Sequence, residues 1–270
     1  AATGRLLLFL DADVYLRPNA LETLGRAMLT LSPDWQESAA TLSVQPYHRT
    51  VRVWERLALL FNILVFVGAA RRIRPLRLSS VYGCCFGPCI LCDRDEYLSF
   101  GGHAAISDRV LDDLELGGCL EAAGVTTRSF AGRGVVEFRM YPSGLRAVLD
   151  GFTKNILLGA QRASGLFRVL SLLWFAGLLA VLPYIWIAAV NGRMSELVVA
   201  TVFYTFFVIQ IAAAGARLGN FGPLPALFFP FHLAVFLAML VRAAVLAVSG
   251  RNVRWKGRSL EPGSPSRRPA

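Results

Sequence analysis

Two carboxylates, Asp11 and Asp13, follow directly after the apolar run Leu6–Leu10. Such a run predicts a buried strand, and side chains alternate along an extended segment, so both carboxylates are expected on one face. Carboxylate oxygens suit Mg²⁺ or Mn²⁺, which can take further ligands from substrate phosphates. The pattern therefore predicts a site for a divalent metal ion that binds a diphosphate. The ion would neutralise the charge on a departing nucleoside diphosphate.

A second acidic pair, Asp112 and Asp113, lies in a segment with helical spacing of apolar residues, 110–123. A carboxylate there could act as a general base that removes the proton of an acceptor hydroxyl as a sugar bond breaks. The alternative is an ordinary acidic residue at a helix N-terminus, where the helix dipole favours negative charge. The residues alone leave both interpretations open.

Four of the five cysteines, Cys84, Cys85, Cys89 and Cys92, lie close together, and the fifth is Cys119. Four neighbouring thiols could bind zinc. However, the two apolar residues between the last pair have the character of a core strand, which favours buried, reduced thiols. The odd count is typical of a cytosolic catalytic face without disulfides.

The chain of 270 residues is 55% hydrophobic, with a mean hydropathy of +0.51 and a net charge of +10. The apolar excess lies after Phe167, which indicates membrane segments rather than an oversized core. Basic residues cluster beside apolar segments, at 71–74 and 251–258. No aromatic-studded basic sheet or recognition helix accompanies them, so we expect anionic lipid headgroups as partners and no nucleic acid.

Strands and helices are expected to alternate in the first half of the chain. A helix is predicted at 18–31 with Leu21, Leu24, Met28 and Leu31 on one face. Asp93 is expected to cap a short helix, and the helix at 110–123 to end at Gly124. The predicted strands are 39–45, 86–92, 125–130 and 135–138. This order indicates an α/β fold whose sheet is at least partly parallel.

Two amphipathic or apolar segments flank this region. Segment 52–70 is too short in its uncharged part to span a bilayer, and it fits either an interfacial helix or a buried core helix. Segment 144–163 combines helical apolar spacing with a polar face, which predicts an interfacial helix.

Three later segments are candidates for membrane spans. Segment 169–190 is long enough, 197–214 is marginal, and 224–248 is interrupted by Pro230, His232 and Arg242. Three spans would place the basic tail opposite the N-terminal domain, yet its cations argue for the cytoplasmic side. We therefore expect one of the last two segments to be re-entrant, and the tail after Leu260 to be disordered.

Six motifs occur in the order expected of one known family. Together they resemble family 2 glycosyltransferases with a GT-A fold, in the membrane-bound branch that includes carotenoid-type (diaponeurosporenoate) glycosyltransferases. The motifs are LFLDAD at 8–13, FGPC at 86–89, GGH at 101–103, DDLELG at 112–117, GFTKN at 151–155 and WKGR at 255–258. The resemblance covers nearly the whole chain to Arg258.

The resemblance implies an inverting single displacement from a nucleotide-sugar donor to a lipid-like or other amphiphilic acceptor. It implies these roles: Asp11 and Asp13 for the Mg²⁺ or Mn²⁺ ion and the diphosphate, Asp113 as catalytic base, Asp112 as its support, and Gly101, Gly102 and His103 on the acceptor side. His103 fits a satisfied loop histidine equally well. Lys154 could reach the diphosphate, or it could be solvated or lipid-facing.

Two departures from the family affect the expectation. The first strands, which carry the nucleotide-base-binding acid, have no counterpart, so an N-terminally incomplete GT-A (Rossmann-like) mixed sheet is expected. The Gln-X-X-Arg-Trp signature of processive synthases is also absent, which argues for one sugar per acceptor. The expected parts are a catalytic domain at 1–140, an interfacial helix at 141–167, transmembrane helices at 168–250 and a basic tail at 251–270.

The resulting hypothesis is a multi-pass membrane enzyme whose catalytic domain is cytoplasmic. The alternative is a catalytically inactive truncated protein, or a lipid-binding membrane protein of the same fold. A transporter is less well supported, because the acidic motifs lie outside the apolar segments, whereas intramembrane charge normally marks an ion path.

Overall fold

The computed structural model describes residues 2–31, 40–68, 80–82, 85–99, 101–106, 116, 120, 124–162, 165–249, 253–255 and 258–260. Two compact units emerge from the contacts within the chain. The sheet unit comprises Ala1–Arg49, Val65–Met140 and Arg254–Ala270, and the helical unit comprises Thr50–Leu64 and Tyr141–Val253.

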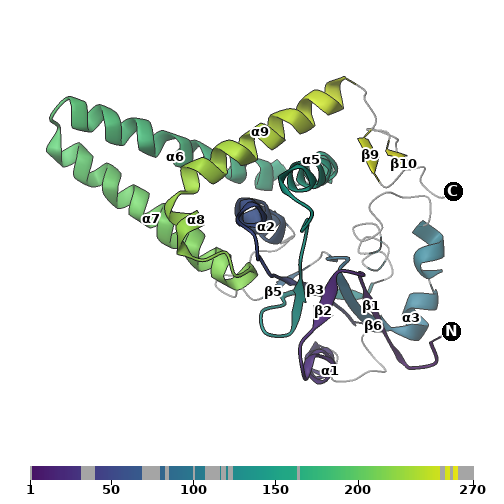
Figure 1. The fold of residues 1–270 in the computed structure, drawn as a ribbon. Helices are drawn as coiled ribbons and strands as arrows, with labels where there is room; N and C mark the ends of the chain where they lie inside the picture. Colours follow the sequence, from purple (N-terminus) through teal and green to yellow (C-terminus); the bar gives the residue numbers. More distant parts are fainter. Residues whose placement is uncertain are drawn as a thin grey trace. The chain divides into compact units, whose positions relative to one another are not determined.

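A mixed five-stranded sheet forms the centre of the sheet unit, as the alternation of elements predicted (Figure 1). Its strands, in spatial order, are β1 (Leu6–Leu10), β6 (Cys89–Asp93), β3 (Ala40–Gln45), β7 (Thr126–Ala131) and β5 (Ser80–Tyr82). Among these five described strands, β3 and β7 are the one parallel pair; β6 is antiparallel to both β1 and β3, and β5 is antiparallel to β7. The strand expected from Phe86 begins three residues later, at Cys89.

A smaller three-stranded sheet continues directly from the end of β1. It has the order β2-β8-β4, with β2 at Val14–Leu16, β8 at Val136–Phe138 and β4 at Tyr47–His48. Arg17, just after β2, forms a 2.7 Å ion pair with Glu137 of β8. The residues between β1 and β2 therefore connect two sheets, both held by hydrogen bonds.

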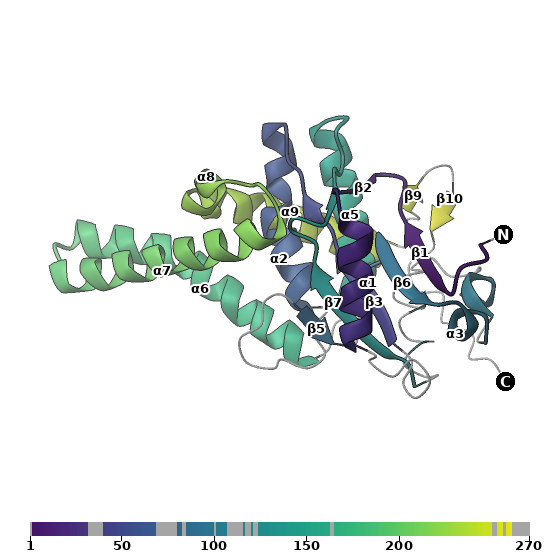
Figure 2. The same ribbon diagram turned by 90° about the horizontal axis from the view of Figure 1, so that it is seen from below.

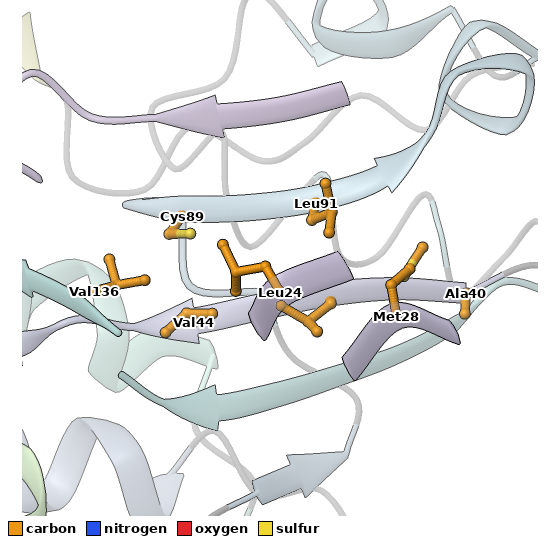
Figure 3. Close-up of a cluster of buried hydrophobic side chains, with 8 residues drawn as sticks. Leu24, Met28, Ala40, Val44, Cys89, Leu91 and Val136 are labelled. Carbon is orange, nitrogen blue, oxygen red and sulfur yellow. The ribbon is translucent and has the colours of Figure 1, made fainter. Parts of the chain in front are cut away.

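Helix α1 (Ala20–Leu31) begins two residues later than expected, because Asn19 has a left-handed backbone with φ of 64°. Its buried residues are Ala20, Leu24 and Met28, four residues apart. Leu21 is 64% exposed, so the predicted apolar face is buried at Leu24 and Met28 but not at Leu21. Figure 3 shows Leu24 and Met28 packed with Val44, Cys89 and other core residues of the sheet unit.

The segment that fitted either an interfacial or a core helix is largely buried over residues 54–66 of its described part. It forms a 3₁₀ helix, η1 (Val53–Ala58), followed by α2 (Leu59–Gly68), and its residues 57–61 are all buried. The Phe61 and Phe152 rings lie 4.3 Å apart, and Phe152 belongs to α5 (Leu145–Arg162), which packs on η1 and α9. The structure therefore favours the core alternative for this segment.

Three helices of the helical unit are long and apolar enough to cross a membrane (Figures 1 and 2). They are α6 (Gly165–Val190), α7 (Met194–Leu218) and α9 (Phe229–Val248). With 25 residues, α7 is no longer of marginal length. The interrupted third candidate is divided at Phe228 into a short helix, α8 (Pro223–Leu227), and α9.

The chain beyond α9 is described only in part. Strands β9 (Val253–Trp255) and β10 (Arg258–Leu260) pair in a two-stranded sheet. The tail after Leu260, expected to be disordered, lies outside the described residues.

Candidate active site

The acidic residues at the end of β1 lie in a turn rather than in an extended segment. The Val14 N–H donates a 3.1 Å hydrogen bond to the Asp11 carbonyl, and the Asp11 N–H donates one of 3.1 Å to the carbonyl of Pro88. The prediction that Asp11 and Asp13 share one face of an extended strand was therefore wrong, because the backbone turns between them. Asp11 and Asp13 are both exposed, and the turn is fixed to the loop that leads into β6.

Three ring side chains pack together beside this turn. Phe9, two residues before Asp11, lies 4.9 Å from both the Tyr97 and the His103 rings. The Tyr97 hydroxyl is 2.7 Å from His103 Nδ1 and accepts a 2.9 Å hydrogen bond from the His103 N–H. The rings thereby link the strand that carries the acidic turn to the loop that was predicted to line the acceptor side.

The glycines of that loop are required by its geometry. Gly101 and Gly102 have φ angles of 83° and 56°, in the left-handed region that glycine adopts readily. Gly102 begins the 3₁₀ helix η2 (Gly102–Ile106), and a Cβ on it would lie 2.4 Å from the ring of Tyr97. The loop therefore approaches Tyr97 as closely as it does only because residue 102 lacks a side chain.

A capped helix holds Tyr97 in place. The Asp93 Oδ1 atom accepts 2.8 Å and 3.4 Å hydrogen bonds from the N–H groups of Asp95 and Glu96, so Asp93 caps α3 (Arg94–Ser99), as predicted. Tyr97 lies on this helix, six residues before His103. The sequence did not predict that Phe9 and Tyr97 form part of this site. For Tyr97 a signal was available, because this tyrosine lies between a predicted helix cap and a Gly-Gly-His loop.

The predicted base and its supporting residue, Asp113 and Asp112, lie outside the described residues. Leu116, three residues further on, and Leu120 have helical backbone and are buried. They belong to a core cluster with Cys85, Ile90 and Val125, against which Phe9 and Tyr97 also pack. The two helical leucines thus contact the same cluster as the rings beside the acidic turn.

Lys154 lies on α5 in the helical unit and is half-buried. Asp11, Asp13 and the loop at 101–103 all belong to the sheet unit. The structure thus brings together the acidic turn and the glycine-histidine loop through Phe9 and Tyr97, whereas Lys154 is held by a different set of contacts.

Glu96, on the same helix as Tyr97, has a partly buried carboxyl group with a raised pKa. Its Oε2 atom is buried, with no hydrogen-bond partner among the described residues. Burial raises the pKa of this carboxyl, the neighbouring Asp93 raises it further, and Arg5 lowers it. Sequence reasoning gave no sign of this residue.

The described cysteines are buried thiols. Cys85, Cys89 and Cys92 are free and buried, and burial raises the pKa of Cys89 and of Cys92 to about 12. Thiols with such values are neutral near pH 7 and poor metal ligands. The structure therefore favours buried, reduced thiols over a zinc site for Cys85, Cys89 and Cys92. Cys84 and Cys119 lie outside the described residues.

Metal binding by the acidic turn would rest on two side chains. Within the described ranges, no three His, Cys, Asp or Glu side chains come together as a metal site. Two exposed carboxylates fit Mg²⁺, which usually takes one or two protein carboxylates and completes its octahedron with water and substrate phosphates. The donor set suits this ion better than a metal that needs an all-protein cage.

The described part of the chain combines a mixed α/β sheet, which carries an acidic turn at a strand end, with three helices apolar enough to cross a membrane. This combination is typical of a membrane-associated α/β protein. No family model matches the chain. Its sequence is similar to curated proteins named 4,4'-diaponeurosporenoate glycosyltransferase, which confirms the resemblance predicted from the motifs.

The similarity to these relatives is distant but extends along most of the chain. The relative from Staphylococcus haemolyticus (strain JCSC1435) is 29% identical over 173 residues, which cover 64% of this chain and 44% of the relative. Those from Staphylococcus aureus strains USA300 and MRSA252 are 27% and 28% identical over 259 residues, or 96% of this chain and 67% of each relative. The chain thus spans less than half of the first relative's length and about two thirds of the others.

Proposed function

We propose that this chain belongs to a glycosyltransferase that moves a sugar from a nucleotide-diphosphate sugar to a carotenoid-type acceptor at a membrane. The similarity to relatives with a glycosyltransferase name supports the transferase class. The structural observation that carries the proposal is the exposed Asp11–Asp13 turn beside the Phe9, Tyr97 and His103 rings. It offers carboxylates for a metal and an adjacent aromatic surface for an acceptor.

Asp11 and Asp13 would hold Mg²⁺ or Mn²⁺ together with the donor diphosphate. When bound, the ion supplies positive charge that stabilises the departing nucleoside diphosphate. The hydrogen bond from the Asp11 N–H to Pro88 fixes the backbone of the turn, so the two carboxylates are held at one place on the surface of the sheet unit. Lys154 remains a candidate second contact to the diphosphate.

The transfer itself would be an inverting single displacement. An acceptor oxygen attacks the anomeric carbon opposite the diphosphate, and the sugar–phosphate C–O bond breaks with its electron pair going to the leaving group. For a hydroxyl acceptor, Asp113 would take the proton and Asp112 would support it. The packing of Leu116 and Leu120 against the cluster that holds Phe9 and Tyr97 supports a role for this segment near the turn.

The acceptor named in the relatives is a carboxylate, which changes what the base must do. A carboxylic acid is ionised at neutral pH, so its oxygen attacks without loss of a proton. A hydroxyl acceptor, in contrast, needs a general base. The dependence on Asp113 should therefore differ between the two kinds of acceptor.

An apolar groove in the helical unit suits the hydrocarbon part of such an acceptor. Its volume is about 540 Å³, within the range of ligand sites. The lining residues are Leu178, Leu179, Leu182, Pro183, Trp186, Pro230 and Leu233. All of them lie on α6 and α9, two of the candidate membrane helices, so an apolar chain would reach the groove from the lipid.

The proposal is tested with the full-length protein in membranes, a panel of nucleotide sugars, Mn²⁺, and acceptors that end in either a hydroxyl or a carboxylate. We expect metal-dependent release of one nucleotide and transfer of its sugar. Asp113→Asn should slow transfer to the hydroxyl acceptor by about 100-fold or more, and transfer to the carboxylate far less.

Asp95→Asn, which changes an exposed carboxylate on α3, is the matched control and should leave both rates unchanged. A folded protein that turns over none of the donors would instead indicate the non-catalytic, lipid-binding alternative. Equal losses with both acceptors after Asp113→Asn would remove the base role while leaving the transferase class intact.

A further inference from the structure

The segment that contains α8 and α9 begins beside Thr50, the first residue of the helical unit. Asn220, just before α8, exchanges hydrogen bonds with Thr50: its side-chain oxygen accepts from the Thr50 N–H, and its Nδ2 donates to the Thr50 carbonyl over 3.0 Å. The Thr50 hydroxyl also donates to the Asn220 carbonyl over 3.2 Å. The start of the α8–α9 segment is thus held next to η1, near the end of α7.

The junction between α8 and α9 lies beside the middle of α7. The Tyr204 hydroxyl donates a hydrogen bond to the Leu227 carbonyl, and the Phe229 ring lies 5.1 Å from Tyr204 and 6.2 Å from Phe207. From Tyr204 to the end of α7 at Leu218, the helix rises by about 21 Å. The junction therefore lies near the depth expected for the centre of a bilayer about 30 Å thick.

Helix α9 then runs back to the end of the unit from which α8 departed (Figures 1 and 2). Phe236 stacks on Phe175, in the first half of α6, with 5.3 Å between the rings. Arg242 donates to Asp150 of α5 over 2.6 Å, and α5 also packs on η1. The rise along α9 from Phe229 to Arg242 is about 20 Å, close to the rise along α7 from Tyr204 to Leu218. Arg242 therefore lies about as far from the α8–α9 junction as the end of α7 does.

Protein groups satisfy the backbone at the junction. A break in a helix at membrane depth is tolerated only where its polar groups find partners inside the protein. The Tyr204 hydroxyl supplies one for Leu227, and the Phe228 N–H donates to the Leu224 carbonyl over 2.9 Å. Phe221, before α8, is buried as well. The junction therefore meets the condition for a turn within the bilayer.

We propose that α8 and α9 form a re-entrant hairpin, so that only α6 and α7 cross the membrane and the chain after α9 returns to the side on which α6 begins. This topology does not depend on the proposed transferase activity. It gives Arg242 and Asp150 a place at the interface, where an ion pair costs far less than at the bilayer centre.

The distribution of charge favours the same topology. Four cations, Arg251, Arg254, Lys256 and Arg258, follow α9 within ten residues. The α6–α7 connection carries only Arg193, which pairs with Glu196 at 3.3 Å. A third crossing would place the larger cationic cluster on the same side as this connection, against the rule that short cytoplasmic segments carry the excess of Lys and Arg.

Three serine-to-cysteine variants of the full-length protein test the topology in intact cells. Ser143→Cys lies just before α5, Ser195→Cys at the start of α7, and Ser266→Cys in the tail. Each is exposed to a membrane-impermeant maleimide before and after permeabilisation, with the parent protein as background. The three described native cysteines are buried, which limits that background.

We expect Ser195→Cys to be labelled in intact cells, and Ser143→Cys and Ser266→Cys to be labelled several-fold more after permeabilisation. If Ser266→Cys is labelled together with Ser195→Cys, α9 crosses the membrane and the proposal is wrong. If Ser143→Cys is labelled with Ser195→Cys, α6 and α7 do not cross as a pair, and the proposal is equally wrong. Labelling of the denatured proteins confirms that every introduced thiol can react.

Discussion

The two units distribute apolar and polar side chains in opposite ways. In the sheet unit, Leu42 and Ile90 are buried in the core, while the carboxylates of the acidic turn face outward. In the helical unit, large apolar side chains are exposed in rows along α6 and α7, among them Leu172, Leu173 and Phe206. Exposed apolar surface of this extent is typical of a membrane-facing region.

Polar groups on the membrane helices are matched with one another. Trp174 of α6 donates a 2.8 Å hydrogen bond to Gln210 of α7, and Tyr204 donates to Leu227. Lipid offers no hydrogen-bond partners, so such groups must be satisfied within the protein. The difference between the units therefore fits two solvents, water around the sheet unit and lipid around α6 and α7, whose length and composition suffice to cross a membrane.

The largest effect on activity should come from replacing Asp11 or Asp13, whose exposed carboxylates make no contribution to the core of the sheet unit. Asp11→Ala and Asp13→Ala should each lower metal-dependent nucleotide release by between about 100- and 1000-fold. The thermal unfolding temperature should change little, since both side chains are exposed. Nucleotide release is measured against Mn²⁺ concentration, and retention of the full rate in either variant would remove the metal site from the turn.

Matched leucines test the two-solvent comparison directly. Leu29 on α1 and Leu179 on α6 are each 50% exposed. Leu179→Asp should cost about 3 kcal/mol of membrane insertion, because it puts a carboxylate near the middle of a spanning helix. Leu29→Asp should cost less than about 1 kcal/mol of folding stability, because its side chain faces water.

The readout is the fraction of protein that resists alkaline extraction from membranes, together with the unfolding temperature. If both aspartate variants were extracted and unfolded alike, α6 would face the same solvent as α1, and the comparison between the units would fail.

A glycine pair separates steric contact at the candidate site from simple backbone strain. Gly102 and Gly134 both have positive φ, but only at Gly102 would a Cβ meet a neighbouring ring, that of Tyr97. Gly102→Ala should lower transfer about tenfold by displacing Tyr97 and His103. Gly134→Ala should cost about 1–2 kcal/mol of stability and leave the rate per folded protein unchanged. Equal rates in the two variants would show that the rings play no part in transfer.

The hydrogen bond at the α8–α9 junction should make a smaller contribution. Tyr204→Phe removes the donor to Leu227 and should lower stability in membranes or detergent by about 1 kcal/mol or less. Tyr184→Phe, on the exposed surface of α6, is the control. The unfolding temperatures of the two variants are compared, and a larger loss in Tyr184→Phe would count against a special role for the junction.

The smallest effect concerns Glu96, a half-buried acid on α3 whose Oε2 atom is buried. Its folded pKa lies above the ordinary value, so its contribution to stability is present in acid and is lost as pH rises through the folded pKa. Glu96→Gln, which does not ionise, should unfold at a higher temperature than the native protein near pH 7, and the gain should vanish below the ordinary pKa of 4.5.

Glu22→Gln, at an exposed position on α1 beside Arg26, is the control and should show no such gain. Thermal unfolding is followed between acid and neutral pH. A gain for Glu96→Gln that persists unchanged in acid would assign the effect to packing rather than to ionisation.

The sequence by itself determined the elements whose signals are local. The strand at 40–45 followed from a short run of strand-forming residues, the cap at Asp93 from a side chain that bonds its own neighbouring N–H groups, and the membrane helices from long apolar runs. The acidic pair at 11–13 and the Gly-Gly-His motif were also visible, because each is contiguous in the chain, whereas the turn that holds the acidic pair was not predicted. Local hydrogen bonding and hydrophobic periodicity are sufficient for such predictions.

Only the tertiary structure decided what depends on contacts between distant segments. It placed Phe9 against Tyr97 and His103, buried 57–61 against α5, put Leu21 on the outside of α1, and returned α9 to the end where Asn220 meets Thr50. Periodicity shows that a helix has an apolar face, but not whether protein or lipid covers that face. That choice is made by the packing of segments far apart in the chain, which no single stretch of sequence contains.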